Sequence, residues 1–404
     1  MFPCILIILL AVFSCYLGDS GFYKKEKITE FTFGRLIGEI RNRPNDNALF
    51  SPLSIYICYT LLLAGAGGYT WQLVADDLGL IDDPKHTSPE LITSEFSKLS
   101  KHYSKDPSMI SSNLMAISET VKVEPEYMKT AEQYLAHISK ENFGKPQEVQ
   151  QNINTWVSNK TNNMIPKMLE KAPDKGTLMI LLNALYFKGK WKKSFNTNGT
   201  RQRKFTNADG SKSSIDFMIR RPNKQDPLSL RYLNDHKKGF QMIELPYKNS
   251  MGMFIILPHE GKKLNKILKN KHHLREWMNK IIGLMKSEPV VVDFLGIPKL
   301  KLDRKYDMKD LVWVEEIYRD KADFSKISHT KLKVGQSIHK VAIEVNEEGT
   351  EAAASTHVEI IAGAMPGGSS GPVRPRFIAD RPFAFFIIDK SNWVISFAGA
   401  INKL

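Results

Sequence analysis

The spacing of apolar side chains divides the chain into a helical first part and a β-rich second part. Up to residue 169, apolar positions recur every three or four residues, which is typical of helices with one buried face. One of these segments begins with Ser-Pro and stops at glycines, as helices do at their ends. A strand is predicted at 109–119, helices at 31–40, 51–68, 70–80, 94–104 and 126–138, and a further helix entering a loop within 152–169.

From residue 177 onward, strand patterns dominate. Residues 177–191 (TLMILLNALYFKGKW) are almost continuously apolar, which indicates a strand buried on both faces. Residues 240–258 predict a hairpin, whereas 289–307, 339–348 and 381–401 predict further strands, the last interrupted by a Lys-Ser-Asn turn. Helices early and strands late, without regular βαβ alternation, predict an α+β fold.

The composition fits one large globular domain. The chain has 404 residues, of which 42% are apolar and 25% charged. No linker rich in Pro, Gly or Ser divides it, except one near the C-terminus. We therefore expect a signal peptide at 1–20 followed by a single domain at 21–404.

A net charge of +14 favours anionic partners. The densest basic run, 262–280, has the spacing of an amphipathic helix with Leu264, Ile267, Leu268, Leu274 and Met278 inward. One interpretation is a solvated helix face, and the other is a glycosaminoglycan site. No motif indicates a nucleic-acid reader. The candidate polyanion-binding residues are Lys262, Lys263, Lys266, Lys269, Lys271 and Arg275.

Several features indicate export. Residues 1–18 form an apolar run with small residues at its end, as in a signal peptide, although a basic n-region is missing. Sequons stand at Asn159 and Asn198. Removal of the signal leaves Cys58 as a lone, buried thiol, so cysteine count excludes a disulfide framework and a zinc or redox site. We expect a secreted, extracellular glycoprotein that is monomeric and does not span the membrane.

The motifs of common enzymes are missing from the sequence: it contains no HExxH, Walker A, GxGxxG or CxxC pattern. Residues 367–371 (GGSSG) match the nucleophile pattern GxSxG around Ser369. That chemistry requires a strand before the serine and a helix after it. Here Pro366 and Pro372 flank the glycines, which favours a linker. We expect no catalytic residues, no metal and no cofactor apart from a glycosaminoglycan.

Residues 344–389 carry a resemblance to a known family. EVNEEGTEAAAST resembles the proximal hinge of the serpin reactive loop, and FIADRPFAFFI resembles the C-terminal serpin signature. FSPLSI, NALYFKGKW, MIELPYKN, ADFSKIS and IHKVAIEV follow in serpin order and spacing, over residues 29–402. The resemblance implies about nine helices, three sheets and an exposed reactive-centre loop at 347–376. By composition alone, a surface helix followed by a linker would be the simpler interpretation.

The resemblance also assigns roles to individual residues. It implies a small-residue hinge in which Thr350, Ala352, Ala354 and Thr356 point inward after insertion and Glu351 points outward. The complete hinge comprises Glu347, Glu348, Gly349, Thr350, Glu351, Ala352, Ala353, Ala354, Ser355 and Thr356. A polar cluster under the main sheet, and an aromatic residue where the loop enters, correspond to Asn47, Ser51, Ser54, Asn183, His339 and Trp191. Without the resemblance, these would be a helix cap and ordinary core residues.

The implied function is suicide inhibition of a serine protease. Cleavage of the loop would give an acyl-enzyme, and insertion of the loop into the main sheet would trap the protease. The reactive bond is expected among Ala362, Gly363, Ala364 and Met365, which suits an elastase-like or chymotrypsin-like target. Arg374 and Arg376 suit trypsin-like enzymes but lie far down the loop. A non-inhibitory serpin acting as carrier, chaperone or storage protein is the alternative, against which the small-residue hinge argues.

Overall fold

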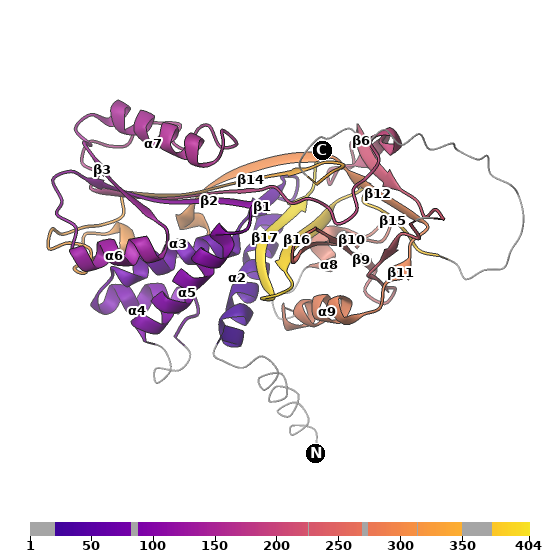
Figure 1. The fold of residues 1–404 in the computed structure, drawn as a ribbon, viewed down its shortest axis with the longest axis horizontal. Coiled ribbons are helices and arrows are strands. Elements are labelled where there is room, and N and C mark those ends of the chain that lie inside the picture. Colours follow the sequence, from indigo (N-terminus) through magenta and orange to yellow (C-terminus); the bar gives the residue numbers. More distant parts are fainter. Residues whose placement is uncertain (1–20, 82–87, 225, 269–273, 313, 350–373) are drawn as a thin grey trace, which may run out of the picture.

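The α+β prediction is confirmed by a computed structural model, which describes residues 21–404 except 82–87, 225, 269–273, 313 and 350–373 (Figure 1). Within these residues the structure has eight α-helices, one fewer than expected. It has four sheets instead of the expected three, because a small two-stranded sheet is present in addition to three larger ones. The helices are α2 (Gly21–Asn42), α3 (Pro52–Ala64), α4 (Gly68–Asp77), α5 (Pro89–Ser104), α6 (Pro125–Gln133), α7 (Pro146–Lys160), α8 (Leu264–Ile267) and α9 (Leu274–Lys286).

The central five-stranded sheet has the order β13-β14-β4-β2-β3. Its strands are β2 (Met109–Ser118), β3 (His137–Glu141), β4 (Met179–Phe187), β13 (Leu300–Asp307) and β14 (Gln336–Val345). Strand β4 is antiparallel to β2 and parallel to β14, whereas β14 is antiparallel to β13. We call this sheet the main sheet.

The main sheet is covered on both faces, which explains the unbroken apolar run of β4. Ile180, Leu182, Ala184 and Tyr186 pack with Val149, Ile153 and Val157 of α7 on one face. Met179, Leu181, Leu185 and Phe187 join the larger core on the other. Figure 1 shows α7 above the sheet and α3 to α6 below it. Alternate side chains of one strand therefore enter two separate cores.

The other sheets complete the larger core. The six-stranded sheet has the order β1-β17-β16-β10-β9-β8, with the predicted hairpin as β9 and β10. Its strands are β1 (Ala48–Phe50), β8 (Tyr232–Asp235), β9 (Phe240–Pro246), β10 (Met251–Pro258), β16 (Phe383–Asp389) and β17 (Val394–Ile401). The four-stranded sheet has the order β15-β12-β6-β5, and β7 pairs with β11. These strands are β5 (Arg201–Thr206), β6 (Lys212–Arg220), β7 (Ser229–Leu230), β11 (Val290–Val291), β12 (Phe294–Pro298) and β15 (Arg376–Ile378).

Several predicted helices have other bounds in the structure: the helix predicted at 31–40 extends over Gly21–Asn42, and the one predicted at 51–68 ends at Ala64. Helix α6 ends at Gln133 and β3 begins at His137, because pairing with β2 takes over the end of the segment predicted at 126–138. The helix entering a loop within 152–169 is found as α7, which begins earlier, at Pro146, and ends at Lys160, after which Asn162 and Asn163 adopt positive φ angles that a helix excludes. The basic run 262–280 contains the separate helices α8 and α9, with residues 269–273 outside the described part.

Among the described residues, no helix is both long enough and apolar enough to cross a membrane. The described residues also contain no group of three or more His, Cys, Asp or Glu side chains arranged to hold a metal ion.

Substitution of Gly399 by Ala should destabilise the junction of β17 with β1. A Cβ atom there would lie 2.5 Å from Phe385 ring carbons and 2.9 Å from the Ala48 carbonyl oxygen. Overpacking of this kind costs about 1–3 kcal/mol. Gly38→Ala in α2 is the matched control, since nothing lies within 4 Å of the added carbon and helix propensity favours Ala by ~1 kcal/mol. Thermal unfolding should show a lower midpoint for Gly399→Ala and an equal or higher one for Gly38→Ala.

Candidate functional site

A buried polar cluster lies where α3 packs under the main sheet. Asn183 of β4 and His339 of β14 are directly opposite each other in the parallel ladder. Ser51 is the N-cap of α3, and Ser54 lies in its first turn. The structure therefore brings together four of the residues that the resemblance assigned to this cluster.

Hydrogen bonds connect every member of this cluster. The Ser51 amide donates to His339 Nε2 at 3.0 Å, so Nδ1 carries the proton and donates to Asn183 Oδ1 at 2.6 Å. The Ser54 hydroxyl also donates to Asn183 Oδ1. The Ser51 hydroxyl donates to the Ser396 carbonyl of β17 at 2.6 Å. Helix α3, the six-stranded sheet and both central strands of the main sheet are thus joined through polar side chains.

His339 is held in its neutral form. Its side chain is fully buried, and burial lowers its pKa to about 3. Tyr306 of β13 lies beside it, with ring centroids 6.4 Å apart, and burial raises the pKa of this phenol to about 12. The cluster therefore carries no charge at neutral pH.

One predicted member lies elsewhere, and another was missed. The Asn47 side chain donates to the Lys403 carbonyl and accepts from the amides of Asn402 and Lys403, so it fixes the C-terminus instead of joining the cluster. Asn113 of β2 accepts from Asn183 Nδ2 at 2.6 Å and extends the cluster to a third strand. In the sequence, only the position of Asn113 within the apolar predicted strand 109–119 indicated that its side-chain amide would be buried.

The hinge begins in a buried ionic contact. The Glu347 carboxylate, 8% exposed, lies 3.0 Å from Lys299 Nζ and accepts from the Thr200 hydroxyl at 2.6 Å. Burial by itself would raise the pKa of Glu347, but the contacts with Thr200 and Lys299 outweigh it and lower this pKa. Neither partner was predicted, because each is far from Glu347 in the sequence.

Trp191 holds the same segment through its backbone and its ring. Its amide donates to the Glu348 carbonyl at 3.0 Å, and its indole Nε1 donates to the Asn346 carbonyl at 2.9 Å. The ring stacks on Tyr247 with centroids 4.4 Å apart. Trp191 therefore lies at the end of β14, where the resemblance placed it.

Gly349 is required by this arrangement. Its φ of +98° disfavours any residue with a Cβ, and such an atom would lie 2.1 Å from the Gly189 carbonyl oxygen. Asn346 and Gly349 close a turn in which the Gly349 amide donates to the Asn346 carbonyl at 3.2 Å. The described chain therefore follows β14 with a tight turn that ends at Gly349.

The strand that precedes this turn, β14, forms a parallel ladder with β4. The two strands are parallel neighbours over eight registered pairs, from Gln336↔Ile180 to Ile343↔Phe187. A segment that follows β14 and folds back between them would be antiparallel to both. Parallel pairing is slightly less stable per residue than antiparallel pairing, so such an exchange is favourable as well as allowed by direction.

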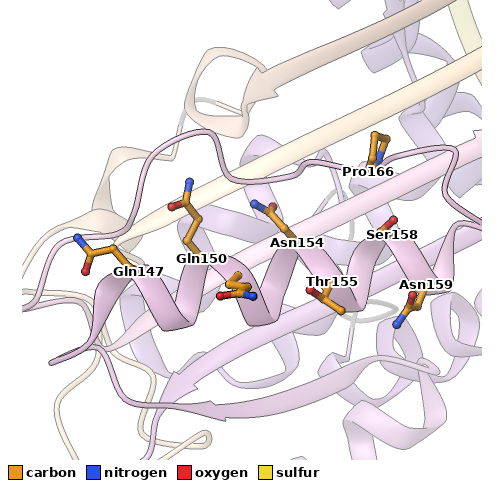
Figure 2. A pocket seen from close by; sticks show the side chains of 8 residues that line it. Gln147, Gln150, Asn154, Thr155, Ser158, Asn159 and Pro166 are labelled. Carbon is orange, nitrogen blue, oxygen red and sulfur yellow. The ribbon is translucent and has the colours of Figure 1, made fainter.

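Helix α7 and its return loop cover this part of the main sheet. Asn154 accepts from the amides of Met168 and Leu169 at 2.8 Å each and donates to the Leu169 carbonyl. The polar side chains of α7 line an open hollow of about 490 Å³. Figure 2 shows them along the helix, with the exposed Asn159 at one end. Gln150 also donates to the Leu169 carbonyl, so two side-chain amides of α7 hold the loop on the helix.

The remaining predicted residues have the following positions. Asn159 and Asn198 are exposed, as are Lys262, Lys263 and Lys266 beside α8. Lys269 and Lys271 lie outside the described residues, and the Arg275 side chain is not described. The hinge from Thr350 to Thr356, the reactive bond at 362–365 and Ser369 also lie outside them.

The buried neutral state of His339 predicts an acid-sensitive fold. The unfolded imidazole has a pKa near 6.5, so between about pH 6.5 and 3 the unfolded chain binds the additional proton. The free energy of unfolding should therefore decrease as the pH is lowered, and this group should account for a decrease of about 1.4 kcal/mol between pH 7.5 and pH 5.5. His339→Gln should lack that loss.

Thermal unfolding midpoints measured from pH 7.5 to 5.5 test this prediction. His329→Gln, at a side chain 92% exposed, is the control and should keep the wild-type pH dependence. An equal pH dependence in wild type and His339→Gln would contradict the assignment of a neutral buried imidazole.

Comparison with known proteins agrees with this geometry. The chain matches a family model described as Serpin (serine protease inhibitor) over residues 26–404. Iripin-2 from Ixodes ricinus is 31% identical over 378 residues, which cover 92% of this chain and 91% of that protein.

Solved structures show the same architecture. Human thyroxine-binding globulin has a TM-score of 0.81 at 22% identity, covering 95% of this chain and 99% of that one. Native protease nexin-1 with heparin has a TM-score of 0.79 at 25% identity, with the same coverage. The protein is a member of the serpin family of serine protease inhibitors and has the serpin fold.

Proposed function

We propose that the protein inhibits a serine protease as a suicide substrate whose cleaved loop enters the main sheet between β4 and β14. The observation that carries this proposal is the parallel pairing of β4 with β14, because a segment that follows β14 and folds back between them would be antiparallel to both. A segment entering there forms two antiparallel ladders in place of one parallel ladder.

The hinge sequence supports entry. Thr350, Ala352 and Ala354 are small at alternating positions, so no bulky or charged side chain has to pass into the core, whereas Glu351 falls on the other face. A strand from Thr350 to about Gly363 would add on the order of ten backbone hydrogen bonds at ~1 kcal/mol net each. The uncleaved fold is then a kinetic trap.

In this mechanism the catalytic serine of the target attacks the carbonyl carbon of the reactive bond. The C–N bond breaks, the new amine takes a proton, and the N-terminal part of the loop stays on the enzyme as an ester. Insertion carries this ester away before water hydrolyses it. Displacing one oxyanion-hole donor already slows such hydrolysis about 10²–10³-fold. Ala362 to Met365 suit an elastase-like or chymotrypsin-like target.

The setting of this activity is extracellular in the proposal. An apolar run at 1–18 supports a signal peptide, and the exposed side chains of Asn159 and Asn198 support glycosylation of both sequons. The one cysteine after that run, Cys58, is buried, and burial raises its thiol pKa, so it requires no disulfide partner. We propose that the protein acts as a monomer.

A sulfated polysaccharide is a proposed partner at the basic run. Lys262, Lys263 and Lys266 are exposed beside α8, and the structure of protease nexin-1 contains heparin. Exposed lysines on one short helix suit a flexible polyanion.

Replacing a small hinge residue by a large charged one tests insertion directly. Thr350→Arg should let the target cleave the loop while preventing entry, because the guanidinium would have to pass into the core. Glu351→Arg is the matched control and should behave like wild type, since in the inserted strand position 351 would face outward. Each protein is incubated with elastase, chymotrypsin and trypsin and resolved on a denaturing gel.

Wild type and Glu351→Arg should give an SDS-stable complex with one protease, and the cleaved fraction should unfold tens of degrees higher. Thr350→Arg should be cleaved without complex. Cleavage of wild type without complex or stabilisation would instead indicate a carrier, chaperone or storage serpin. Ester turnover abolished by Ser369→Ala would indicate a hydrolase, and either result overturns the proposal.

A further inference from the structure

Three arginines gather around one phenylalanine ring in the four-stranded sheet. The guanidinium carbons of Arg203, Arg221 and Arg376 lie 5.6, 5.0 and 5.2 Å from the centroid of the Phe294 ring. Any two of these guanidinium carbons are therefore no farther apart than the sum of their distances from the ring centroid. We call these four residues the arginine cluster.

The sheet assembles this cluster from three strands and a loop. Phe294 of β12 is opposite Arg376 of β15 in the parallel ladder, and directly paired residues point to the same face. Arg221 directly follows β6, whose last residue pairs with Leu295, and Arg203 lies on β5. Gly296 leaves room for the ring: a Cβ there would lie 3.2 Å from Phe294 Cε1. Strand register thus brings together residues 173 positions apart.

Phe294 serves as a platform and not as core. Its side chain is only 3% exposed, yet it belongs to neither apolar cluster of the molecule. Arginine stems and guanidinium planes can bury an aromatic face in this way. Arg221 and Arg376 are nevertheless exposed, so their charged ends remain open to solvent.

No described carboxylate lies within ion-pair distance of the cluster. None of its three arginines forms an ion pair with a described carboxylate. Nearby arginines behave differently: Arg220 pairs with Asp226, and Arg231 pairs with Glu244 at 3.1 Å. Like charges held this close repel each other, and an anion would relieve that repulsion.

We propose that the arginine cluster binds sulfate groups of a sulfated polysaccharide. Guanidinium groups present planar pairs of donors that match the oxygens of sulfate, and three groups around one ring can address one sulfate from several sides. Basic residues continue outward from the cluster, with Arg201 exposed on β5 on the same face as Arg203 and Arg374 exposed before β15. A chain of sulfates gains contacts along this path that a single free ion cannot gain.

This site is separate from the basic run at 262–275, and it goes beyond the proposed inhibition. Its test therefore needs no protease. The triple variant Arg203→Gln, Arg221→Gln, Arg376→Gln removes the cluster charges. The variant Lys262→Gln, Lys263→Gln, Lys266→Gln removes the same number of charges at α8, the other proposed polysaccharide site, so that the two contributions are compared. Circular dichroism and unfolding midpoints establish that both variants are folded.

Binding of a heparin oligosaccharide is titrated calorimetrically over a range of NaCl concentrations, with inorganic sulfate and desulfated heparin as further probes. The cluster variant should bind at least tenfold more weakly, and its slope of log K against log salt should flatten by roughly two to three, as loss of three phosphate-type contacts does. The α8 variant should lose less on both measures, and desulfated heparin should bind weakly to all three proteins.

Three results would overturn the proposal. A larger loss in the α8 variant would place the site on the basic run. Inorganic sulfate binding as tightly as the oligosaccharide would indicate a site for a free ion. Unchanged heparin binding, combined with slower complex formation between the cluster variant and a protease in the absence of heparin, would indicate that the arginines meet an acidic protein surface.

Discussion

The parallel ladder between β4 and β14 is the constraint on which the rest of the molecule depends. Two parallel strands side by side in the main sheet leave a position where a third strand, running antiparallel to both, would make better pairs with each. The side chains of Asn183 and His339 hold this ladder together at its centre, where they bind each other and the start of α3. Since breaking the ladder exposes these buried polar groups before new partners reach them, the cluster raises the barrier to opening. It specifies the closed sheet more than it stabilises the fold.

A second set of contacts lies at the end of β14. Like the buried polar cluster, these contacts oppose the separation of β4 from β14. Glu347 is held by Thr200 and Lys299, while Trp191 holds the carbonyl groups of Asn346 and Glu348. Under the proposed mechanism, insertion begins where the loop leaves β14, so these contacts would be released before the ladder opens further down. Each contact is worth only about 1–3 kcal/mol. Under the proposed mechanism, several weak contacts that break one after another would keep the uncleaved sheet closed and still allow rapid rearrangement after cleavage.

Local pattern was sufficient for the elements but not for the contacts between them. The unbroken apolar run of β4 and the hairpin of β9 and β10 were predictable because burial on two faces and turn chemistry are written in neighbouring residues. Ser51, Asn183 and His339 were identified only through family resemblance, since each alone is an ordinary cap or core residue. Asn47 was wrongly grouped with them because its short distance from Ser51 in sequence says nothing of its bonds to the C-terminus. Lys299 and Thr200 were missed since register between distant strands selects them.

The position of the arginine cluster separates it from the movement of the loop. Arg376 begins β15, which three registered pairs hold against β12, whereas the hinge begins at Glu347 on another sheet. Under the proposed mechanism, a cut at 362–365 frees the N-terminal side of the loop and leaves the C-terminal side attached to β15. The hinge contacts are then lost, but the register that places Arg376 on Phe294 is not. A polysaccharide bound at the cluster would therefore gain no affinity from the uncleaved state and would hold intact inhibitor and spent complex alike. Its effect would be on where the protein resides, and not on when the sheet opens.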